Sequence, residues 1–524
     1  MNVPLTPIRF KERAAKLYGN NIGVVCGNDR FTYREFALRC NRFGNALRSI
    51  GLVPGGRVAF LSFNCHRLLE AYYGVVQADG ILLPLNVRLR PQELCGILQD
   101  AEAQFLFYDP EFAEPVKRQL SEASLVAIPF TASKGETSYE ALLAAADDQY
   151  QFDMTLDEND VAELFYTSGT TGNNKGVMLT HRNLYLHALS TMWTLRTWDS
   201  GVNLHTIPMF HVNGWGAPHC VTGAGGVHVM VRRFDPVEVL GLIERERATH
   251  FSLVPTMAIA LAQAQQSAKR DVSSVQEINI GGAASNPTLI KYMEEAFPGA
   301  FVHAGYGLTE TSPCVTVSRL KDTLADVPEP ERLQLLSMPG LEMIGTEVRV
   351  VDVHGKDVKP DGREIGEVII RGDGVMKGYW KRARETREAI RDGWLYTGDM
   401  AVVNSENYIQ IVDRKKDIII SGGENISTLE IESALYRHPD VLECAVIAIP
   451  DEKWGEVPCA LIVTRSGKPI EMQELQHFCR DNLAGYKIPR AFHFRESLPK
   501  GGTGKILKRE LREPFWSDQT RRVH

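Results

Sequence analysis

The chain has 524 residues, of which 44% are hydrophobic and 23% charged, with a formal net charge of −7. A chain of this length is too long to fold around one compact hydrophobic core, so we expect two or more domains. The charge balance indicates no nucleic-acid or anionic-membrane surface, and no apolar run is long enough to span a bilayer. Nine scattered cysteines without a Cys-x-x-Cys pair, and an N-terminus without a signal-peptide core, predict a cytoplasmic protein with reduced thiols.

Short apolar strands alternate with helical stretches in the first part of the chain. Strands are predicted at 57–62, 80–85, 105–108, 126–129 and 161–165, a helix at 66–78, and a strand running into a helix at 177–189. This alternation is typical of α/β sheets with helices on their faces.

A long polar loop follows the last of these single strands. It runs from Tyr166 to His181, is rich in Gly, Ser and Thr, and contains Lys175. Backbone N–H groups, hydroxyls and an ammonium in one loop favour phosphate binding over a bare surface turn. The loop is not a Walker A motif, because Asn174 replaces the second Gly and Gly176 replaces the magnesium-binding Ser or Thr. These departures disfavour a P-loop kinase.

Two glycine-containing loops lie further along the chain, at 281–284 and 305–311. Glycines let the backbone approach a flat ligand closely. In the second loop, Tyr306 can stack on a base, which contributes roughly 1–3 kcal/mol. The carboxylate of Glu310 suits magnesium. Gly-Gly after a strand is by itself usually a tight turn, so a nucleotide role for these loops depends on a family resemblance.

The sequence pattern changes from about residue 343, where strands at 348–352 and 366–371 indicate a β-rich subdomain. We predict a boundary that gives domains 1–412 and 413–524. The second is long enough for a small α/β domain. Its predicted elements are helices at 430–437 and 470–483 and strands at 443–449 and 460–464.

Three segments after residue 395 contain polar residues that could bind a ligand. Asp399 ends a Tyr-Thr-Gly-Asp segment, and its carboxylate can accept both hydroxyls of a ribose that Arg414 can also reach. A glycine loop occupies 421–426. Near the C-terminus, Lys505 lies among glycines that would let its side chain move in and out of a site. Lys500 is a second candidate for this mobile lysine.

The chain resembles the adenylate-forming superfamily of acyl- and aryl-CoA synthetases, beetle luciferases and peptide-synthetase adenylation domains over nearly its whole length. The resemblance rests on the loop around Lys175 and on the segments 305–311, 396–399, 421–426 and 499–507. It implies a large N-terminal domain of two α/β sheet subdomains plus a β-rich subdomain, and a small mobile C-terminal α/β domain. It also implies ATP, Mg²⁺ and CoA, with a carboxylic acid activated as acyl-AMP, release of pyrophosphate and transfer of the acyl group to CoA.

The resemblance assigns catalysis to Lys505, Lys175, Thr309, Glu310 and His211, with Glu310 also holding magnesium. It assigns nucleotide contacts to Thr167, Ser168, Gly169, Thr170, Thr171, Gly172, Gly282, Ala283, Tyr306, Asp399 and Arg414. The acyl pocket is assigned to His211, Asn213, Trp215, Gly281 and Gly282, CoA to Gly422, Gly423, Trp454 and Tyr486, and the domain hinge to Lys416. We expect His211 to wall the pocket without moving a proton, because a carboxylate is already ionised at neutral pH.

The segment 208–216 resembles fatty-acyl and short-acyl synthetases more than coumarate ligases. It favours a medium- or long-chain fatty acid, with an aryl acid such as benzoate or coumarate, or a short-chain acid, as alternatives. The loop at 421–426 fits free CoA, which disfavours a peptide-synthetase domain. A luciferase-like oxidase and a homodimer stay open. Intact Lys505, Glu310 and Asp399 disfavour a non-catalytic nucleotide-binding regulator.

Overall fold

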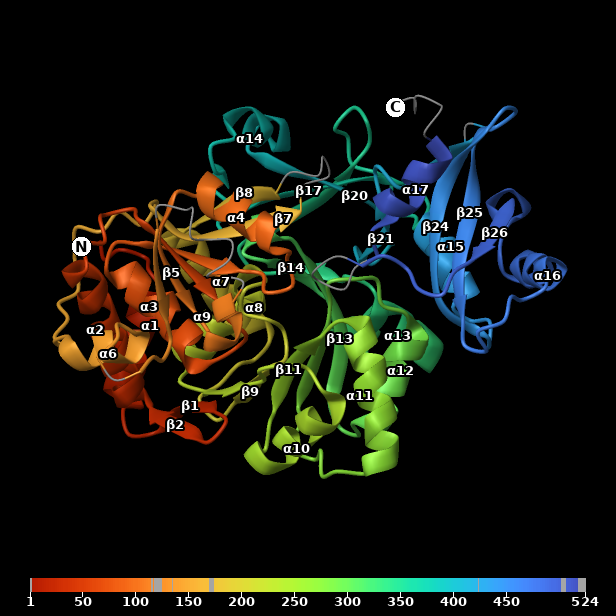
Figure 1. Cartoon of the computed structure of the whole chain (residues 1–524). Helices are drawn as coiled ribbons and strands as arrows, with labels where there is room; N and C mark the ends of the chain where they lie inside the picture. The colour runs from red at the N-terminus through yellow and green to blue at the C-terminus, as the bar shows by residue number, and fades with distance from the viewer. Residues whose placement is uncertain are drawn as a thin grey trace. The chain divides into compact units, whose positions relative to one another are not determined.

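The computed structural model describes residues 2–114, 116, 125–133, 135–168, 174–422, 424–500 and 506–516. Packing divides the chain into two compact units, one with Met1–Val348 and Ile370–Leu395 and the other with Arg349–Ile369 and Tyr396–His524. The boundary between 412 and 413 stays a prediction. Both units contain helices and strands, which confirms the predicted α/β class (Figure 1).

A seven-stranded sheet in the first unit carries the predicted phosphate loop. Its order is β18 (Gly378–Tyr379), β8 (Asn174–Thr180), β7 (Val161–Ser168), β4 (Ile81–Leu85), β3 (Arg57–Leu61), β5 (Ala103–Tyr108) and β6 (Val126–Pro129). The five strands from β7 to β6 run parallel, whereas β8 is antiparallel to β7. The helices of this part of the chain are α2 (Tyr33–Ser49), α3 (His66–Gln77), α4 (Pro91–Asp100), α6 (Tyr139–Ala145) and α7 (His181–Thr194).

Local sequence explains several of these elements. All of β4 is buried, as expected of a parallel strand with both faces covered. Helix α2 begins with a capping box, in which the Thr32 hydroxyl accepts from the Glu35 N–H and the Glu35 carboxylate accepts from the Thr32 N–H. Helix α7 follows β8 directly, because the Thr180 hydroxyl accepts from the Asn183 N–H. The predicted strand-to-helix change within 177–189 is therefore confirmed.

A nine-stranded sheet forms the rest of the first unit's framework. Its order is β15 (Leu341–Glu342), β14 (Cys314–Val317), β13 (Phe301–Gly307), β12 (Glu277–Ile280), β11 (His250–Leu253), β9 (Val202–His205), β10 (Val227–Met230), β1 (Ile22–Cys26) and β2 (Asp29–Thr32). The central strands β13, β12, β11, β9 and β10 are parallel. Helices α10 (Pro236–Glu246), α11 (Pro255–Ala268) and α12 (Pro287–Ala296) lie along one side of this sheet (Figure 1).

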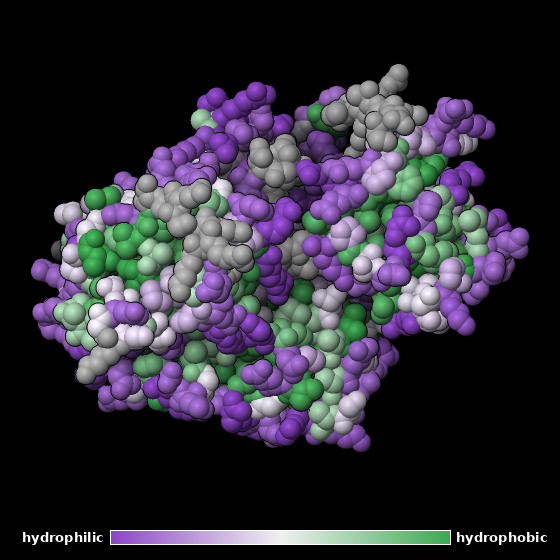
Figure 2. All heavy atoms as spheres, in the orientation of Figure 1, coloured by the Kyte–Doolittle hydropathy of each residue, from purple (hydrophilic) through white to green (hydrophobic). Residues whose placement is uncertain are grey.

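The remaining helices of this unit are α1 (Ile8–Leu17), α8 (Val212–Trp215), α9 (Ala217–Ala224), α13 (Glu329–Ser337) and α14 (Ala383–Ala389). Its core is rich in aromatic rings, such as Phe43 and Phe107, whose centroids are 5.2 Å apart. Hydrophilic residues cover most of the face seen in Figure 2, with hydrophobic side chains in scattered groups.

The β-rich segment predicted from residue 343 forms a five-stranded sheet. Its order is β16 (Thr346–Val351), β17 (Gly366–Gly372), β20 (Trp394–Val403) and β19 (Ile390–Arg391), with β21 (Ile409–Arg414) paired to β20. The predicted strands at 348–352 and 366–371 are thus confirmed within a residue or two.

A further five-stranded sheet organises the C-terminal part of the second unit. Its order is β23 (Glu424–Ile426), β22 (Ile419–Ser421), β25 (Gly455–Thr464) and β24 (Val441–Asp451), with β26 (Ala491–Phe494) paired to β25. The accompanying helices are α15 (Thr428–Leu435), α16 (Met472–Asn482) and α17 (Lys508–Trp516). Each element predicted here is present, although β25 begins well before the predicted 460–464.

Candidate active site

The predicted phosphate loop connects the antiparallel strands β7 and β8. Thr167 pairs with Lys175, and Ser168 with Asn174, so the two ends of the loop lie side by side. The predicted residues Gly169, Thr170, Thr171 and Gly172 lie outside the described residues. The Nζ of Lys175 lies 5.0 Å from the centroid of the Tyr379 ring, which is a cation–π distance. This contact holds the ammonium beside the base of the loop.

Tyr379 contacts two of the predicted catalytic residues, Lys175 and Glu310. It lies in β18, where it pairs with Val177 of β8. Its ring faces Lys175, and its hydroxyl donates to Oε1 of Glu310 at 2.9 Å. Burial and the neighbouring Glu310 carboxylate raise the pKa of Tyr379, so the hydroxyl stays protonated and donates at neutral pH. Tyr379 was not predicted from the sequence, because its strand is short and its partner strand is far away in the chain.

The 3₁₀ turn η2 (Thr309–Thr311) presents Thr309 and Glu310 directly after β13. The Glu310 carbonyl accepts from the Met376 N–H at 2.8 Å, and Thr309 is buried. No group of three or more His, Cys, Asp or Glu residues within the described ranges is placed to hold a metal. A single fixed carboxylate nevertheless fits Mg²⁺, which usually binds through one or two carboxylates, water and substrate phosphates.

The loop after β12 packs against the indole of Trp215. A Cβ atom on Gly281 would lie 3.2 Å from Cη2 of Trp215, and one on Gly282 would lie 3.2 Å from its Cζ2. Gly282 also has a φ of +76°, which glycine adopts without strain. Ala283 follows and is exposed. On β13, which pairs with β12, Tyr306 has Thr316 of β14 as its cross-strand neighbour. Three of the predicted acyl-pocket residues thus lie in contact.

The loop that carries Trp215 is held in a left-handed conformation. The φ angles are +31° at Val212, +42° at Asn213, +52° at Gly214, +60° at Trp215 and +85° at Gly216. Such values are unfavourable for a β-branched residue such as Val212, so other contacts must hold the loop. His211 precedes it as the N-cap residue of α8.

Asn213 supplies those contacts. Its Nδ2 donates to Oε2 of Glu163 at 3.2 Å, and its Oδ1 accepts from the Gly216 N–H at 2.7 Å. The other carboxylate oxygen of Glu163 lies 2.7 Å from Nε2 of His219. Asn213 is only 1% exposed. Its amide therefore holds the loop in place, and its assignment to the acyl pocket stays a prediction.

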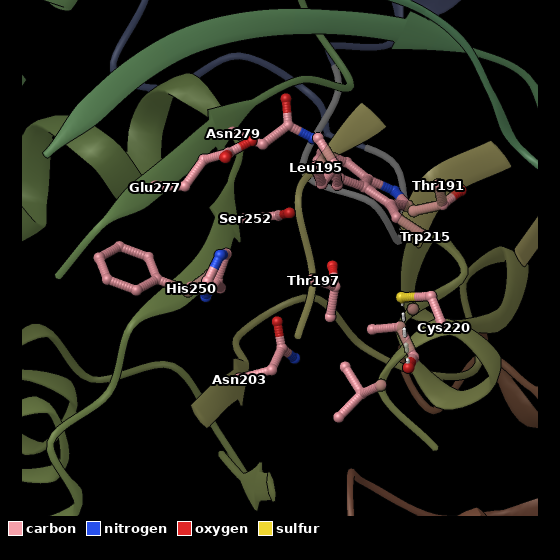
Figure 3. A pocket seen from close by; sticks show the side chains of 14 residues that line it. Thr191, Leu195, Thr197, Asn203, Trp215, Cys220, His250, Ser252, Glu277 and Asn279 are labelled. Carbon is pink, nitrogen blue, oxygen red and sulfur yellow. Dashed lines mark hydrogen bonds between the residues drawn. The ribbon is translucent and has the colours of Figure 1, made fainter. Parts of the chain in front are cut away.

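A chamber of about 40 Å³ has Trp215 in its lining. Figure 3 shows side chains of β9, β11 and β12 together with Trp215, Thr191 and Cys220 around it. Its strand side is polar, since its lining includes Asn203, His250, Ser252, Glu277 and Asn279.

In the second unit, the two predicted ribose residues are paired. Asp399 and Arg414 are cross-strand neighbours in β20 and β21, and Nε of Arg414 lies 2.6 Å from Oδ1 of Asp399. The Asp399 N–H donates to the Thr397 hydroxyl at 3.0 Å. The Asp399 side chain is almost fully buried, whereas that of Arg414 is 41% exposed. The pair combines a fixed carboxylate with an accessible guanidinium.

Two of the predicted CoA residues lie together. A Cβ atom on Gly422, whose φ is +59°, would lie 2.6 Å from Cε3 of Trp454, and the Gly422 N–H donates to the Trp454 carbonyl at 2.9 Å. Tyr486 lies in the 3₁₀ turn η4 (Gly485–Lys487) and is half exposed. Gly423 lies outside the described residues.

Two lysines of the second unit have predicted roles, Lys416 as the domain hinge and Lys505 as the catalytic lysine. Lys416 lies just after β21, and burial lowers its pKa. Lys505 lies outside the described residues. The competing Lys500 forms an ion pair with Glu443. The choice of Lys505 over Lys500 as the catalytic lysine stays a prediction.

Comparison with known proteins decides the family. The family model "AMP-binding enzyme" matches residues 10–380, and the model "AMP-binding enzyme C-terminal domain" matches residues 430–505. The chain belongs to the AMP-binding enzyme family. It is thus an enzyme of the adenylate-forming superfamily, as its motifs indicated.

The relatives of this AMP-binding enzyme include CoA ligases. It is 35% identical to a peroxisomal butyrate–CoA ligase of Arabidopsis thaliana, covering 98% of this chain and 93% of the relative. It is 37% identical to a long-chain-fatty-acid–CoA ligase of Thermus thermophilus, covering 97% of this chain and 95% of the relative. ATP-bound MatB from Rhodopseudomonas palustris superposes with a TM-score of 0.85 at 28% identity, covering 97% of this chain and 99% of that structure.

No helix within the described ranges is both long and apolar enough to cross a membrane.

Proposed function

We propose that this AMP-binding enzyme is an AMP-forming CoA ligase that converts a carboxylic acid to its CoA thioester through acyl-AMP. The observation that carries the proposal is the placement of Lys175 and Glu310 on the two sides of Tyr379, beside the loop at the end of β7. An ammonium and a magnesium-binding carboxylate held together suit the polyphosphate of a nucleotide. The CoA ligases among the relatives support the same reaction.

In the first step, an oxygen of the substrate carboxylate bonds to the α-phosphorus of ATP and the bond to pyrophosphate breaks. Positioning and charge neutralisation supply most of the catalysis in such transfers. Lys175 and residues 167–172 bind the β- and γ-phosphates, Tyr306 stacks on adenine, and Thr309 contacts the α-phosphate. Asp399 and Arg414 hold the ribose hydroxyls.

Magnesium, when bound, neutralises phosphate charge. Glu310 is the residue that would hold it. Tyr379 keeps the Glu310 carboxylate in place, because its hydroxyl donates to Oε1 and leaves Oε2 for other contacts.

In the second step, the thiol of CoA attacks the acyl carbonyl, the thioester bond forms and AMP leaves. Lys505 acts in the first step only, where its ammonium balances charge on the carboxylate and the α-phosphate. We propose that a rotation about Lys416 then removes Lys505 and brings Gly422 and Gly423 to the thiol arm, with Trp454 and Tyr486 near the CoA nucleotide.

The sequence did not identify the acid that the enzyme activates. The segment 208–216 favoured a medium- or long-chain fatty acid, with aryl and short-chain acids as alternatives. The chamber beside Trp215 is small, about 40 Å³, which favours the short end of this range. The cytoplasmic location and the homodimer stay predictions, and the Arabidopsis relative is peroxisomal by name.

Acid-dependent exchange of labelled pyrophosphate into ATP tests the first step. We expect exchange that needs an acid and Mg²⁺ but not CoA. A protein that only binds nucleotide would show no exchange with any acid, and a kinase would form ADP.

A further inference from the structure

One wall of the chamber beside Trp215 comes from the nine-stranded sheet, and apolar residues such as Leu195, Ala217 and Val221 line it elsewhere. Its lining takes Asn203 from β9, His250 and Ser252 from β11, and Glu277 and Asn279 from β12. Alternate residues of a strand point to the same face, so the two residues from β11 and the two from β12 form neighbouring polar rows. Figure 3 shows the labelled side chains of these rows around the same space. A pocket for a long alkyl chain would have an apolar lining on the strand side as well.

Asn279 stands out among these polar residues. It is 7% exposed, and within the described residues its Oδ1 has no hydrogen-bond partner. Glu277, by contrast, is paired with His303 at 2.9 Å and with Arg319 at 2.9 Å. A buried amide oxygen without a partner is costly, and such groups in native proteins usually receive a donor from water or a ligand.

The position of Asn279 connects it to the reacting centre of the proposed function. It lies two residues before Gly281 on β12, a separation of about 7 Å along an extended strand. The Trp215 indole both lines the chamber and packs on Gly281 and Gly282. A small acid whose carboxylate lies at the glycine loop therefore has its other end directed toward Asn279.

From these observations we infer that the chamber holds the acyl end of the substrate, and that this substrate is a short hydroxy acid whose hydroxyl donates to Asn279. The inference rests on the proposed function. A hydroxyl also accepts hydrogen bonds, so it pairs with either end of the amide. An alkyl acid of the same size leaves the Asn279 oxygen unpaired, and sites built to bind a hydroxyl reject such analogues strongly.

The test compares hydroxy acids with their methyl isosteres. The purified full chain is assayed for AMP formation with 3-hydroxybutanoate against 3-methylbutanoate and with 4-hydroxybutanoate against pentanoate, together with hexanoate and palmitate. We expect kcat/KM for at least one hydroxy acid to exceed that of its isostere by about 10-fold or more. We expect Asn279→Leu to abolish or reverse this ratio.

Asn203→Leu makes the same change at the other asparagine of the chamber and should preserve the ratio. Melting temperatures of both variants show whether each still folds. Equal or better turnover of the isosteres by the unaltered chain would overturn the inference, as would the same loss of ratio in both variants. Absence of AMP with every acid would instead count against the proposed ligase activity itself.

Discussion

The amide of Asn213 donates to the buried carboxylate of Glu163, with Nδ2 and Oε2 3.2 Å apart. This bond ties the strand that leads into the phosphate loop to the left-handed loop that carries Trp215. The position of the indole over Gly281 and Gly282 therefore depends on the buried amide of Asn213.

Replacing Asn213 by alanine tests this dependence. Loss of the amide leaves Glu163 with one partner fewer in a buried site, which costs about 1–3 kcal/mol. We expect a lower melting temperature and a KM for the acid that is roughly 10-fold higher, because Trp215 loses its fixed position. Asn407 also has a positive φ, +64°, but lies in an exposed turn. Asn407→Ala is therefore the control, and an equal rise in KM there would contradict the explanation.

Tyr379→Phe removes the hydrogen bond to Glu310 and keeps the ring that faces Lys175. We expect kcat/KM for ATP to fall by roughly 10-fold, in line with one charge-assisted hydrogen bond of about 1.5–3 kcal/mol that is partly replaced by water. The concentration of Mg²⁺ for half-maximal rate should rise with it. Tyr436→Phe, a change at a half-exposed tyrosine of α15's C-terminal end, should leave both values unchanged. Identical kinetics for Tyr379→Phe would remove Tyr379 from this role.

Several buried histidines predict a loss of stability in mild acid. Burial lowers the pKa of His181 to about 4 and that of His187 to about 4. In the unfolded chain each titrates near the ordinary value of about 6.5. The unfolded state thus binds more protons below that pH, so stability is full above pH 6.5 and falls as the pH drops toward 4.

For His181 alone, this difference is on the order of 2 kcal/mol between pH 8 and pH 5. Urea unfolding at these two pH values measures it. His181→Gln removes the titrating group and should reduce the loss between pH 8 and pH 5. A stability that is flat over this range would show that folding does not lower the pKa of these histidines.

Lys505→Ala separates the two half-reactions. Loss of electrostatic stabilisation should slow acyl-AMP formation by roughly 10²–10³-fold. Conversion of supplied acyl-AMP and CoA to thioester should continue near the normal rate, because Lys505 takes no part in it. Lys500→Ala, which removes an ion pair with Glu443, is the control and should leave adenylation unchanged. An equal loss of both half-reactions in Lys505→Ala would contradict the assignment.

Restricting the backbone at the proposed hinge should slow thioester formation and spare acyl-AMP formation. Lys416→Pro fixes φ at this position, so thioester formation should fall while pyrophosphate exchange continues. An unchanged thioester rate would remove Lys416 from the hinge role.

The sequence predicted those parts of the fold and site that depend on local chemistry. Alternating apolar strands and helices predicted the α/β class, and the change from strand to helix within 177–189 was also predicted. Motif residues such as Glu310 and Asp399 were found because their spacing matches a family. Their geometry was not predictable, since the contact of Tyr379 with Glu310 depends on pairing between β18 and β8.

Asn213 shows the limit more clearly. The resemblance assigns it to the acyl pocket, and the structure adds that a run of positive φ angles accompanies the hydrogen bond from its amide to Glu163. No local sequence pattern predicts that a run of positive φ angles begins at a valine. Asn279 was missed for a related reason, because a polar residue in a short buried strand gains meaning only when its neighbours around the chamber are known.

The most direct test of the central claim is product analysis with ATP, Mg²⁺, CoA and a panel of acids. The panel runs from acetate to palmitate and includes hydroxybutanoates, benzoate and coumarate. We predict AMP, pyrophosphate and acyl-CoA in equal amounts with at least one acid, and the best acid among the short ones. Formation of ADP, or no AMP with any acid of the panel, would contradict an AMP-forming CoA ligase.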